Sequence, residues 1–172
     1  SALMIGELAR QAGFPPGVFN IIPGLGEEAG NALIHHPGVN HLSFTGSTEI
    51  GTLVQQAAAK NAVPVTLELG GKSPQLVFAD SDLEEALPFL INASIQNCGQ
   101  TCSAASRLIV ENSIYEQLMS KLGERFEALL VGPAIQDLNC GPLISPGQKM
   151  RLEKYLNQVK ADGLNISAEG KI

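Results

Sequence analysis

The sequence predicts an α/β fold in which helices lie on the faces of a mainly parallel sheet. Short apolar runs, typical of buried strands, alternate along the 172 residues with segments whose apolar residues recur every three or four positions. The chain is 44% hydrophobic, which is enough for a packed core, and it carries a net charge of −6. This balance disfavours a nucleic-acid partner, because such proteins normally present a basic patch.

The composition also bears on where the protein is found. No apolar run approaches the ~18 residues of a membrane helix, and no charged segment followed by an apolar run marks a signal peptide, so we expect no membrane partner. Three cysteines, an odd number, favour free thiols in a reducing compartment and hence a cytoplasmic protein. The chain starts at Ser1 instead of a methionine, as a piece of a longer protein would.

The N-terminal segment contains four predicted elements. Residues 2–12 have the apolar spacing of a helix, which Gly13 and the following Pro-Pro-Gly sequence end. The apolar run 18–22, stopped by Pro-Gly, predicts a buried strand. Residues 27–34 predict a short helix, and residues 41–44 predict a second strand.

The next feature is a glycine-containing turn at residues 45–51 (Thr-Gly-Ser-Thr-Glu-Ile-Gly). A helix is predicted after it, because apolar residues follow at positions i, i+3, i+4, i+7 and i+8 from Ile50, and Ser47 or Thr48 is a suitable N-cap. A strand, a glycine turn and a helix N-terminus together present free backbone N–H groups to a phosphate. The segment lacks the lysine of a P-loop and the G-x-G-x-x-G pattern, so a well-capped helix without a ligand is the alternative.

Residues 63–69 predict a strand that ends in a Gly-Gly turn and carries Glu68 between two leucines. Burial of an unpaired carboxylate is costly, so a carboxylate in this setting is a candidate general base. The alternative is a surface glutamate on a strand whose side chains alternate between its two faces. The local sequence leaves both interpretations open.

The C-terminal part also alternates between strands and helices. Two capping boxes are predicted, Ser81 with Glu84 and Ser113 with Glu116. Pro88 falls inside the first of these helices, where it predicts a kink or a later start. The predicted elements are, in order, strand 75–79, a helix from the first capping box to about residue 94, strand 107–111, helix 113–130, loop 133–142, a helix from Ser145 to Gly163, and a strand at 164–168.

Two of the three cysteines, Cys98 and Cys102, lie in the sequence Asn-Cys-Gly-Gln-Thr-Cys-Ser. Cys102 has small and polar neighbours, as an accessible thiol would, and is the candidate nucleophile. Cys98 and Cys140 fit the small buried hydrophobe that an unreactive cysteine usually is. On a helix, the spacing of Cys98 and Cys102 could place two thiols on a metal, but two more ligands would be needed and no metal site is expected. A cysteine–histidine hydrolase would need a nearby histidine, and the sequence names no such partner.

Three motifs occur in an order and at separations that resemble the aldehyde dehydrogenase superfamily. They are Phe-Thr-Gly-Ser-Thr-Glu-Ile-Gly at 44–51, Leu-Glu-Leu-Gly-Gly-Lys-Ser-Pro at 67–74 and Gly-Gln-Thr-Cys-Ser at 99–103. The resemblance covers the chain from end to end and implies oxidation of an aldehyde to a carboxylic acid with NAD or NADP as cofactor. It also implies a partial Rossmann-like parallel sheet in a nucleotide-binding domain over residues 1–70, followed by part of an α/β catalytic domain over residues 71–172.

The resemblance assigns a role to each matching residue. Cys102 would attack the aldehyde to give a thiohemiacetal, which becomes a thioester after hydride transfer, and Glu68 would activate the water that hydrolyses the thioester. The backbone N–H of Cys102 would supply one donor to the oxyanion. The expected cofactor contacts are Gly24 in the loop after the first strand, Thr45 and Leu69 near the nicotinamide, Gly46 and Ser47 at the pyrophosphate, Ile50 toward the adenine, and Gly51 in the same turn.

Members of this superfamily are longer than the chain, and several of their functional parts have no counterpart in it. These are the asparagine that supplies the second oxyanion donor, a lysine and a glutamate that contact the cofactor riboses, and the oligomerisation strand. The resemblance therefore implies an internal fragment, inactive alone and with exposed apolar faces, of a homodimeric or homotetrameric enzyme. Two alternatives are a thiol-dependent esterase or acyl transferase without hydride transfer, and a non-catalytic member with a structural role.

Overall fold

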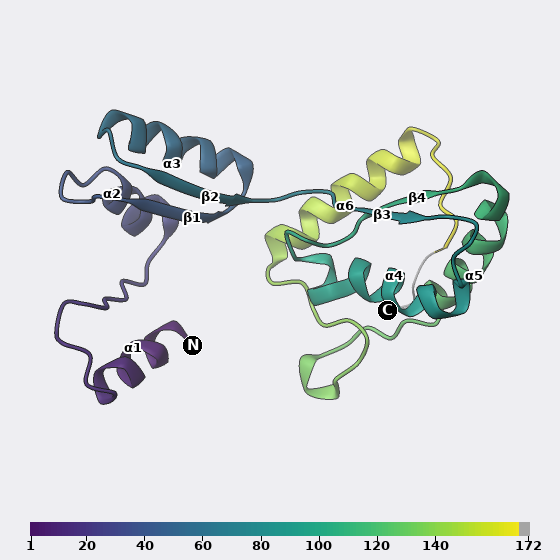
Figure 1. Ribbon diagram of the computed structural model, residues 1–172, viewed down its shortest axis with the longest axis horizontal. Coiled ribbons are helices and arrows are strands. Elements are labelled where there is room, and N and C mark those ends of the chain that lie inside the picture. Colours follow the sequence, from purple (N-terminus) through teal and green to yellow (C-terminus); the bar gives the residue numbers. More distant parts are fainter. Residues whose placement is uncertain (169–172) are drawn as a thin grey trace. The chain divides into compact units, whose positions relative to one another are not determined.

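The computed structural model of the chain describes residues 1–168 (Figure 1). The chain forms two compact units, one comprising Ser1–Leu69 and the other beginning at Gly70, and each contains a two-stranded parallel sheet with helices. This confirms the predicted α/β class. The N-terminal unit holds α1 (Ala2–Gln11), the helical turn η1 (Gly26–Gly30), α2 (Asn31–Ile34), β1 (Leu42–Gly46), α3 (Thr48–Lys60) and β2 (Val65–Leu69). The C-terminal unit holds β3 (Pro74–Val77), α4 (Leu83–Ile95), β4 (Arg107–Val110), α5 (Tyr115–Glu127), α6 (Pro146–Ala161) and the short turns η2 (Gln96–Gly99), η3 (Asn112–Ile114) and η4 (Ala134–Gln136).

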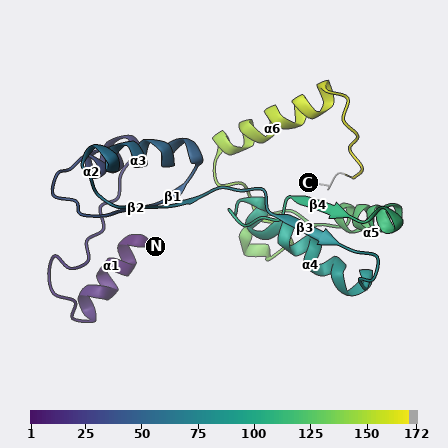
Figure 2. The same ribbon diagram turned by 45° about the horizontal axis from the view of Figure 1, so that its top comes forward.

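The β1–α3–β2 segment contains the packed core of the N-terminal unit, and α3 lies along the two strands (Figures 1 and 2). The two strands are parallel and pair in register over the whole length of each strand. α3 covers one face of this sheet, because the buried Val54 and Ala58 of the helix pack with Leu42 of β1. Side chains along β1 and β2 alternate between the two faces of the sheet. Those that do not face α3 point to the other face, where they are exposed and mainly polar.

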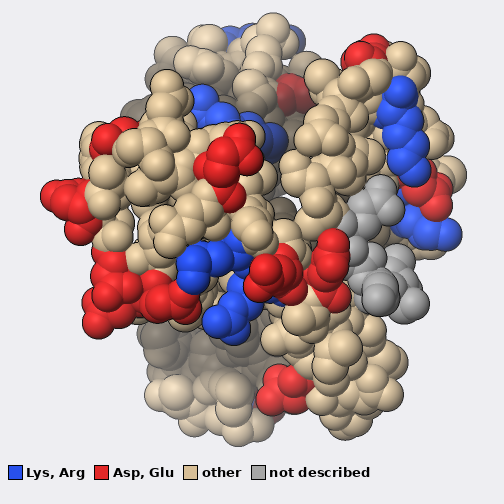
Figure 3. All heavy atoms as spheres, turned by 90° about the vertical axis from the view of Figure 1, so that its right-hand side faces the viewer, with Lys and Arg blue, Asp and Glu red and all other residues tan. Residues whose placement is uncertain are grey.

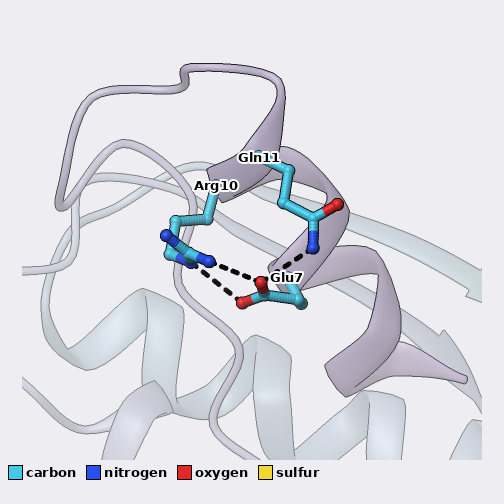
Figure 4. Close-up of polar contacts among 3 residues, drawn as sticks. All are labelled: Glu7, Arg10 and Gln11. Carbon is cyan, nitrogen blue, oxygen red and sulfur yellow. Dashed lines mark hydrogen bonds and ion pairs between the residues drawn. The ribbon is translucent and has the colours of Figure 1, made fainter.

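α1 has no buried residue, and a network of exposed side chains joins its last two turns (Figure 4). Glu7 accepts hydrogen bonds from Arg10 Nη2 at 2.6 Å, from Arg10 Nε at 2.9 Å and from Gln11 Nε2 at 2.9 Å. These bonds lower the pKa of the Glu7 carboxyl to about 2, with Arg10 contributing most. The predicted N-terminal helix is confirmed to within one residue.

Two predicted strands, 18–22 and 164–168, are absent from the structure. A strand requires a neighbour with which to exchange backbone hydrogen bonds, and neither segment pairs with any described residue. The apolar residues of the first segment, Val18 and Ile22 among them, are exposed instead of buried. Asn20 Nδ2 donates to the carbonyl oxygen of Gly17 at 2.8 Å, next to the turn at residues 16–18.

β3 and β4 form the sheet of the C-terminal unit, with Pro74 opposite Arg107 and Val77 opposite Val110. α4 connects the two strands and packs with α5 on one sheet face. The buried core of this unit consists of Val77, Leu83, Leu87, Leu90, Ile91, Leu118 and Leu122. α4 continues through Pro88 and ends at Ile95, where the chain enters the cysteine segment.

The predicted capping box of α4 does not form, because the neighbouring aspartate is the N-cap. Asp82 Oδ1 accepts hydrogen bonds from the backbone N–H groups of Glu84 at 2.9 Å and Glu85 at 3.2 Å. Ser81 therefore lies one residue before the cap, and its hydroxyl does not reach the first turn. Asp82 satisfies two N–H groups that the helix leaves unpaired at its start.

The second predicted capping box, at α5, is also wrong. The turn η3 moves the helix start to Tyr115, and the hydroxyl of Ser113 donates to Glu111 Oε1 at 2.9 Å. The predicted cap of α6 is confirmed, since Ser145 Oγ accepts from the backbone N–H of Gln148 at 3.3 Å.

Large apolar side chains are exposed in both units, as expected for this chain. They lie on α1, on the outer face of the β3–β4 sheet and on α6, and include Leu3, Ile5, Leu8, Leu76, Ile109, Leu152 and Tyr155. Figure 3 shows one face of the molecule, where acidic and basic side chains are both scattered among uncharged ones. Among residues 1–168, every helix falls short of the length and apolarity that crossing a bilayer requires.

Candidate active site

The carboxyl ends of β1 and β2 bring four of the predicted site residues to one edge of the sheet. Thr45 lies opposite Glu68, and Gly46 lies opposite Leu69. Ligands of parallel α/β sheets bind at this edge, beyond the carboxyl ends of the strands. Thr45 and Glu68 are exposed, whereas Leu69 is half-buried beneath α3. The N-terminal unit therefore presents an exposed hydroxyl and an exposed carboxylate at the end of the sheet where such ligands bind.

Glu68 is exposed at this edge, as the surface interpretation expected. The side chains of β2 alternate, so that Leu67 and Leu69 are half-buried and Glu68 faces solvent. Because the Glu68 carboxylate contacts solvent, it pays no desolvation cost and needs no buried partner to offset one. The role of Glu68 as general base stays a prediction.

The turn from β1 into α3 has the features of an anion-binding helix N-terminus. Ser47 is the N-cap, with extended backbone and with Oγ accepting from the backbone N–H of Ile50 at 3.3 Å. The other N–H groups of the first turn have no partner within the helix and lie at the positive end of its dipole. A Cβ atom added at Gly46 would lie 2.4 Å from Phe44 Cζ, so a larger residue at this point of the turn would require the Phe44 ring to move. This arrangement suits a phosphate group of a nucleotide cofactor.

A surface cavity of ≈ 710 Å³ lies beside this turn, between η1 and α2 on one side and α3 on the other. Ile50 and Leu53 of α3 line it together with Leu25 and Gly26 of the loop that begins at Gly24. The size and the mixed apolar and polar lining are those of a small-molecule site. Gly24 does not itself line the cavity, and a Cβ atom there would lie 2.8 Å from Ala29 Cβ. The structure thus brings two of the predicted cofactor segments, those of Gly24 and Ile50, to one cavity.

Gly51 is buried and faces the sheet. A Cβ atom at this position would lie 2.6 Å from Leu69 Cδ2, so the glycine allows α3 to pack closely on β2. The structure therefore gives Gly51 a packing role, and a direct contact with a cofactor stays a prediction.

The cysteine segment of the C-terminal unit leaves the helical conformation. Asn97, Cys98 and Gly99 have positive φ angles of 50°, 57° and 71°, a region that non-glycine residues seldom occupy. Cys98 and Cys102 consequently do not share a helix, and the helical spacing considered for a metal pair is wrong. Within residues 1–168, no group of three or more histidine, cysteine, aspartate or glutamate side chains is arranged to hold a metal ion.

The three thiols differ in exposure. Cys102 is exposed, Cys98 is half-buried and Cys140 is buried, and all three are free. Burial raises the pKa of the Cys140 thiol, and the neighbouring Cys98 raises it further. Cys102 is therefore the most accessible of the three thiols, and its role as the nucleophile stays a prediction.

The segment that follows Cys102 is fixed to β3 and α4 by polar side chains that the sequence did not single out. Gln75 Nε2 donates to Ser94 Oγ at 3.2 Å and to the carbonyl oxygen of Ala105 at 3.1 Å. Ser94 Oγ donates to the same Ala105 carbonyl at 3.0 Å. Ala104 and Ala105 are buried, so the chain just after the thiol is held in place. A polar residue at an inward position of a strand was the available sequence signal for Gln75.

The family model described as the aldehyde dehydrogenase family matches residues 1–172. Aldehyde dehydrogenase 1A1 of Gallus gallus is 43% identical over 172 residues, which are 99% of this chain and 34% of that protein. Retinal dehydrogenase 2 of Homo sapiens is 44% identical over 173 residues, covering 99% of this chain and 33% of that protein. The NAD+ complex of an aldehyde dehydrogenase from Bacillus cereus superposes with a TM-score of 0.93 and 38% identity, covering 96% of this chain and 34% of that one. The chain spans about a third of the length of the curated relatives it matches.

Proposed function

Because this chain belongs to the aldehyde dehydrogenase family, we propose that the whole protein oxidises an aldehyde to a carboxylic acid with NAD+ or NADP+. The observation that carries this proposal is the exposed, free Cys102 in a segment whose flanks are fixed by hydrogen bonds. An accessible thiol in a held loop is what covalent catalysis on a carbonyl carbon needs.

The N-terminal unit would bind the cofactor. Gly46 and Ser47 would hold the pyrophosphate at the N-terminus of α3, and the cavity lined by Ile50 would take the adenine. Thr45 and Leu69 would lie toward the nicotinamide, which when bound accepts a hydride. The relative from Bacillus cereus was solved as an NAD+ complex, which supports a nicotinamide cofactor.

Cys102 would carry the substrate through the reaction. Its thiolate sulfur bonds to the aldehyde carbon, and the carbonyl electron pair moves to the oxygen, where the Cys102 backbone N–H is one donor. Loss of the hydride from that carbon leaves a thioester on the sulfur. Glu68 would then take a proton from water as the water oxygen attacks the thioester carbon, releasing the acid and restoring the thiolate.

This reading assigns residues 1–70 to the nucleotide-binding domain and residues 71–172 to the thiol-bearing part of the catalytic domain. We infer that the whole protein is cytoplasmic and acts as a homodimer or homotetramer, as implied by the family. The isolated chain is expected to be inactive, because it spans about a third of its relatives.

The test is reduction of NAD+ or NADP+ by a panel of aldehydes with a full-length protein that contains this segment, followed by the absorbance of the reduced cofactor. Cys102→Ser should lower kcat to below about 0.1% of the parent value, and Glu68→Gln should lower it about 100-fold. Cys98→Ser and Glu116→Gln are the matched controls, and both should stay active.

Three results would contradict the proposal. Turnover that survives Cys102→Ser would exclude this residue as the nucleophile. Ester cleavage without any cofactor reduction would favour a thiol esterase or acyl transferase. A full-length protein with neither activity would favour a structural role.

A further inference from the structure

The side chain of Gln100 connects the cysteine segment to a loop more than forty residues later in the chain. Its Oε1 atom accepts a hydrogen bond from the backbone N–H of Ile144 at 2.9 Å. Its Nε2 atom donates to the carbonyl oxygen of Asn97 at 3.1 Å and to that of Pro142 at 3.5 Å. Both ends of the amide are thus used: Oε1 contacts only the later loop, and Nε2 contacts both the cysteine segment and that loop. The side chain is half-buried and lies two residues before Cys102.

The turn just before Gln100 has an unusual backbone conformation, which needs stabilising contacts of this kind. Asn97 and Cys98 are non-glycine residues with left-handed φ angles, which persist only where surrounding contacts hold them. Asn97 Nδ2 donates to the carbonyl oxygen of Gln100 at 3.2 Å, and the backbone N–H of Gln100 donates back to the Asn97 carbonyl at 3.1 Å. The side chain and backbone of Gln100 therefore close the turn that leads to Cys102.

The loop on the far side of Gln100 is itself anchored. Cys140 pairs with Val131 in a β-bridge, with its N–H donating to Leu130 at 3.1 Å and its carbonyl accepting from Gly132 at 3.0 Å. Gln100 thus attaches the turn before Cys102 to a fixed point of the unit. The Gln75 and Ser94 contacts to Ala105 fix the chain after Cys102 in the same way.

We propose that Gln100 is a positioning residue, which holds the turn before Cys102 so that the thiol and the backbone N–H of Cys102 meet the carbonyl group in one geometry. The inference rests on the proposed function for its catalytic consequence, although the predicted loss of loop order does not depend on activity. A positioning residue acts on the orientation of the nucleophile, so its loss should lower kcat far more than it raises KM.

The experiment compares Gln100→Ala, Gln100→Glu and the matched control Gln117→Ala in the full-length protein. Gln117 is an exposed residue of the same type on α5. In Gln100→Ala, amide exchange at Ile144 should rise at least about tenfold, because its acceptor is gone. In Gln100→Glu, the acceptor for Ile144 is kept but the donors to Asn97 and Pro142 are lost, so only the cysteine turn should lose protection.

Both Gln100 variants should lower kcat about 100-fold with KM changed less than about threefold, and thermal midpoints should stay within about 2 °C of the parent. The control should match the parent in exchange, kinetics and midpoint. Unchanged Ile144 exchange in Gln100→Ala, or a kcat loss that merely follows a lowered thermal midpoint, would overturn the proposal. If the parent protein reduces no cofactor with any aldehyde, the proposed function fails, while the exchange data still decide whether Gln100 orders the turn.

Discussion

At the scale of single residues, the surroundings of the three thiols separate a candidate nucleophile from two packing residues. Cys140 is buried and its pKa is raised by that burial, so its thiolate form is disfavoured. Cys102 is exposed, between a turn closed by Gln100 and two buried alanines. The thiolate is the nucleophilic form of cysteine, and it is disfavoured at Cys140. The exposure of Cys102 and the order of its loop therefore favour Cys102 as the nucleophile.

The Glu7 carboxylate provides a residue-scale prediction about pH. Its pKa is lowered from 4.5 to about 2, first by the hydrogen bonds from Arg10 and then by the one from Gln11. A lowered pKa in the folded state means that the contact stabilises α1 fully above the ordinary pKa and that this contribution is lost as the pH falls toward 2. Carboxyl chemical shifts followed by NMR through this range should report the midpoint near 2.

Arg10→Ala should return the Glu7 midpoint most of the way to its ordinary value, whereas Gln11→Ala should move it less, because Arg10 is the larger cause. Since all three side chains are exposed, added salt should weaken the shift. An unchanged midpoint in Arg10→Ala would contradict the geometry shown in Figure 4.

Site residues could be predicted from the sequence only where their chemistry is local. Cys102 among small polar neighbours and Ser47 as an N-cap are recognisable from adjacent residues. Gln100 is not, because its partner Ile144 lies 44 positions away. The left-handed backbone at Asn97 and Cys98 is equally hidden, since neither residue type requires it and only the tertiary contacts maintain it.

At the scale of elements, periodicity predicted the helices better than it predicted strands or caps. α3 has a full stripe of apolar residues on one face, and its length follows from that stripe. The apolar run 18–22 has the composition of a strand but no pairing partner among the described residues, and composition alone cannot supply one. Neither capping box formed, because Asp82 next to Ser81 is the N-cap of α4, and because Ser113 lies within the turn η3, which moves the start of α5 to Tyr115.

The cap of α4 provides the element-scale prediction. Asp82→Ala removes an acceptor shared by two backbone N–H groups and a charge at the favourable end of the helix dipole. We expect a loss of about 1 kcal/mol in the free energy of unfolding, measured by urea denaturation followed by circular dichroism. Ser81→Ala is the matched control, and its effect should stay within about 0.5 kcal/mol. If Ser81→Ala lowered the free energy of unfolding more than Asp82→Ala does, Ser81 and not Asp82 would be the N-cap of α4.

At the scale of the whole molecule, the chain has two small sheets with much apolar surface left open. Neither α1 nor α6 has a buried residue, although both carry large apolar side chains. Exposed apolar area of this extent marks surfaces that contact other parts of a protein or a partner. The resemblance to longer proteins predicted this exposure of apolar side chains. Composition alone could not predict it, because a chain that is 44% hydrophobic can also bury most of its apolar side chains.

The isolated 172-residue chain is therefore expected to self-associate and to bind an apolar fluorescent dye. Sedimentation velocity over a range of concentrations should show species larger than 18.1 kDa, despite the net charge of −6. Replacing Leu152 and Leu156 of α6 by serine should reduce dye binding, whereas the same change at the buried Leu118 should unfold the C-terminal unit. A dye-free monomer that unfolds cooperatively would contradict this prediction.

The pairing of β1 with β2 places Thr45 beside Glu68. The connection between the two strands must have a length that permits this register. Side chains along a strand change face at every residue, so shifting β2 by one position would turn Glu68 toward α3 and put Leu67 or Leu69 on the exposed face of the sheet. Insertions in the connection between Lys60 and Val65 are harmless only while the ladder keeps its alignment. The exposure of Glu68 at this end of the sheet thus depends on a count of residues as much as on their identity.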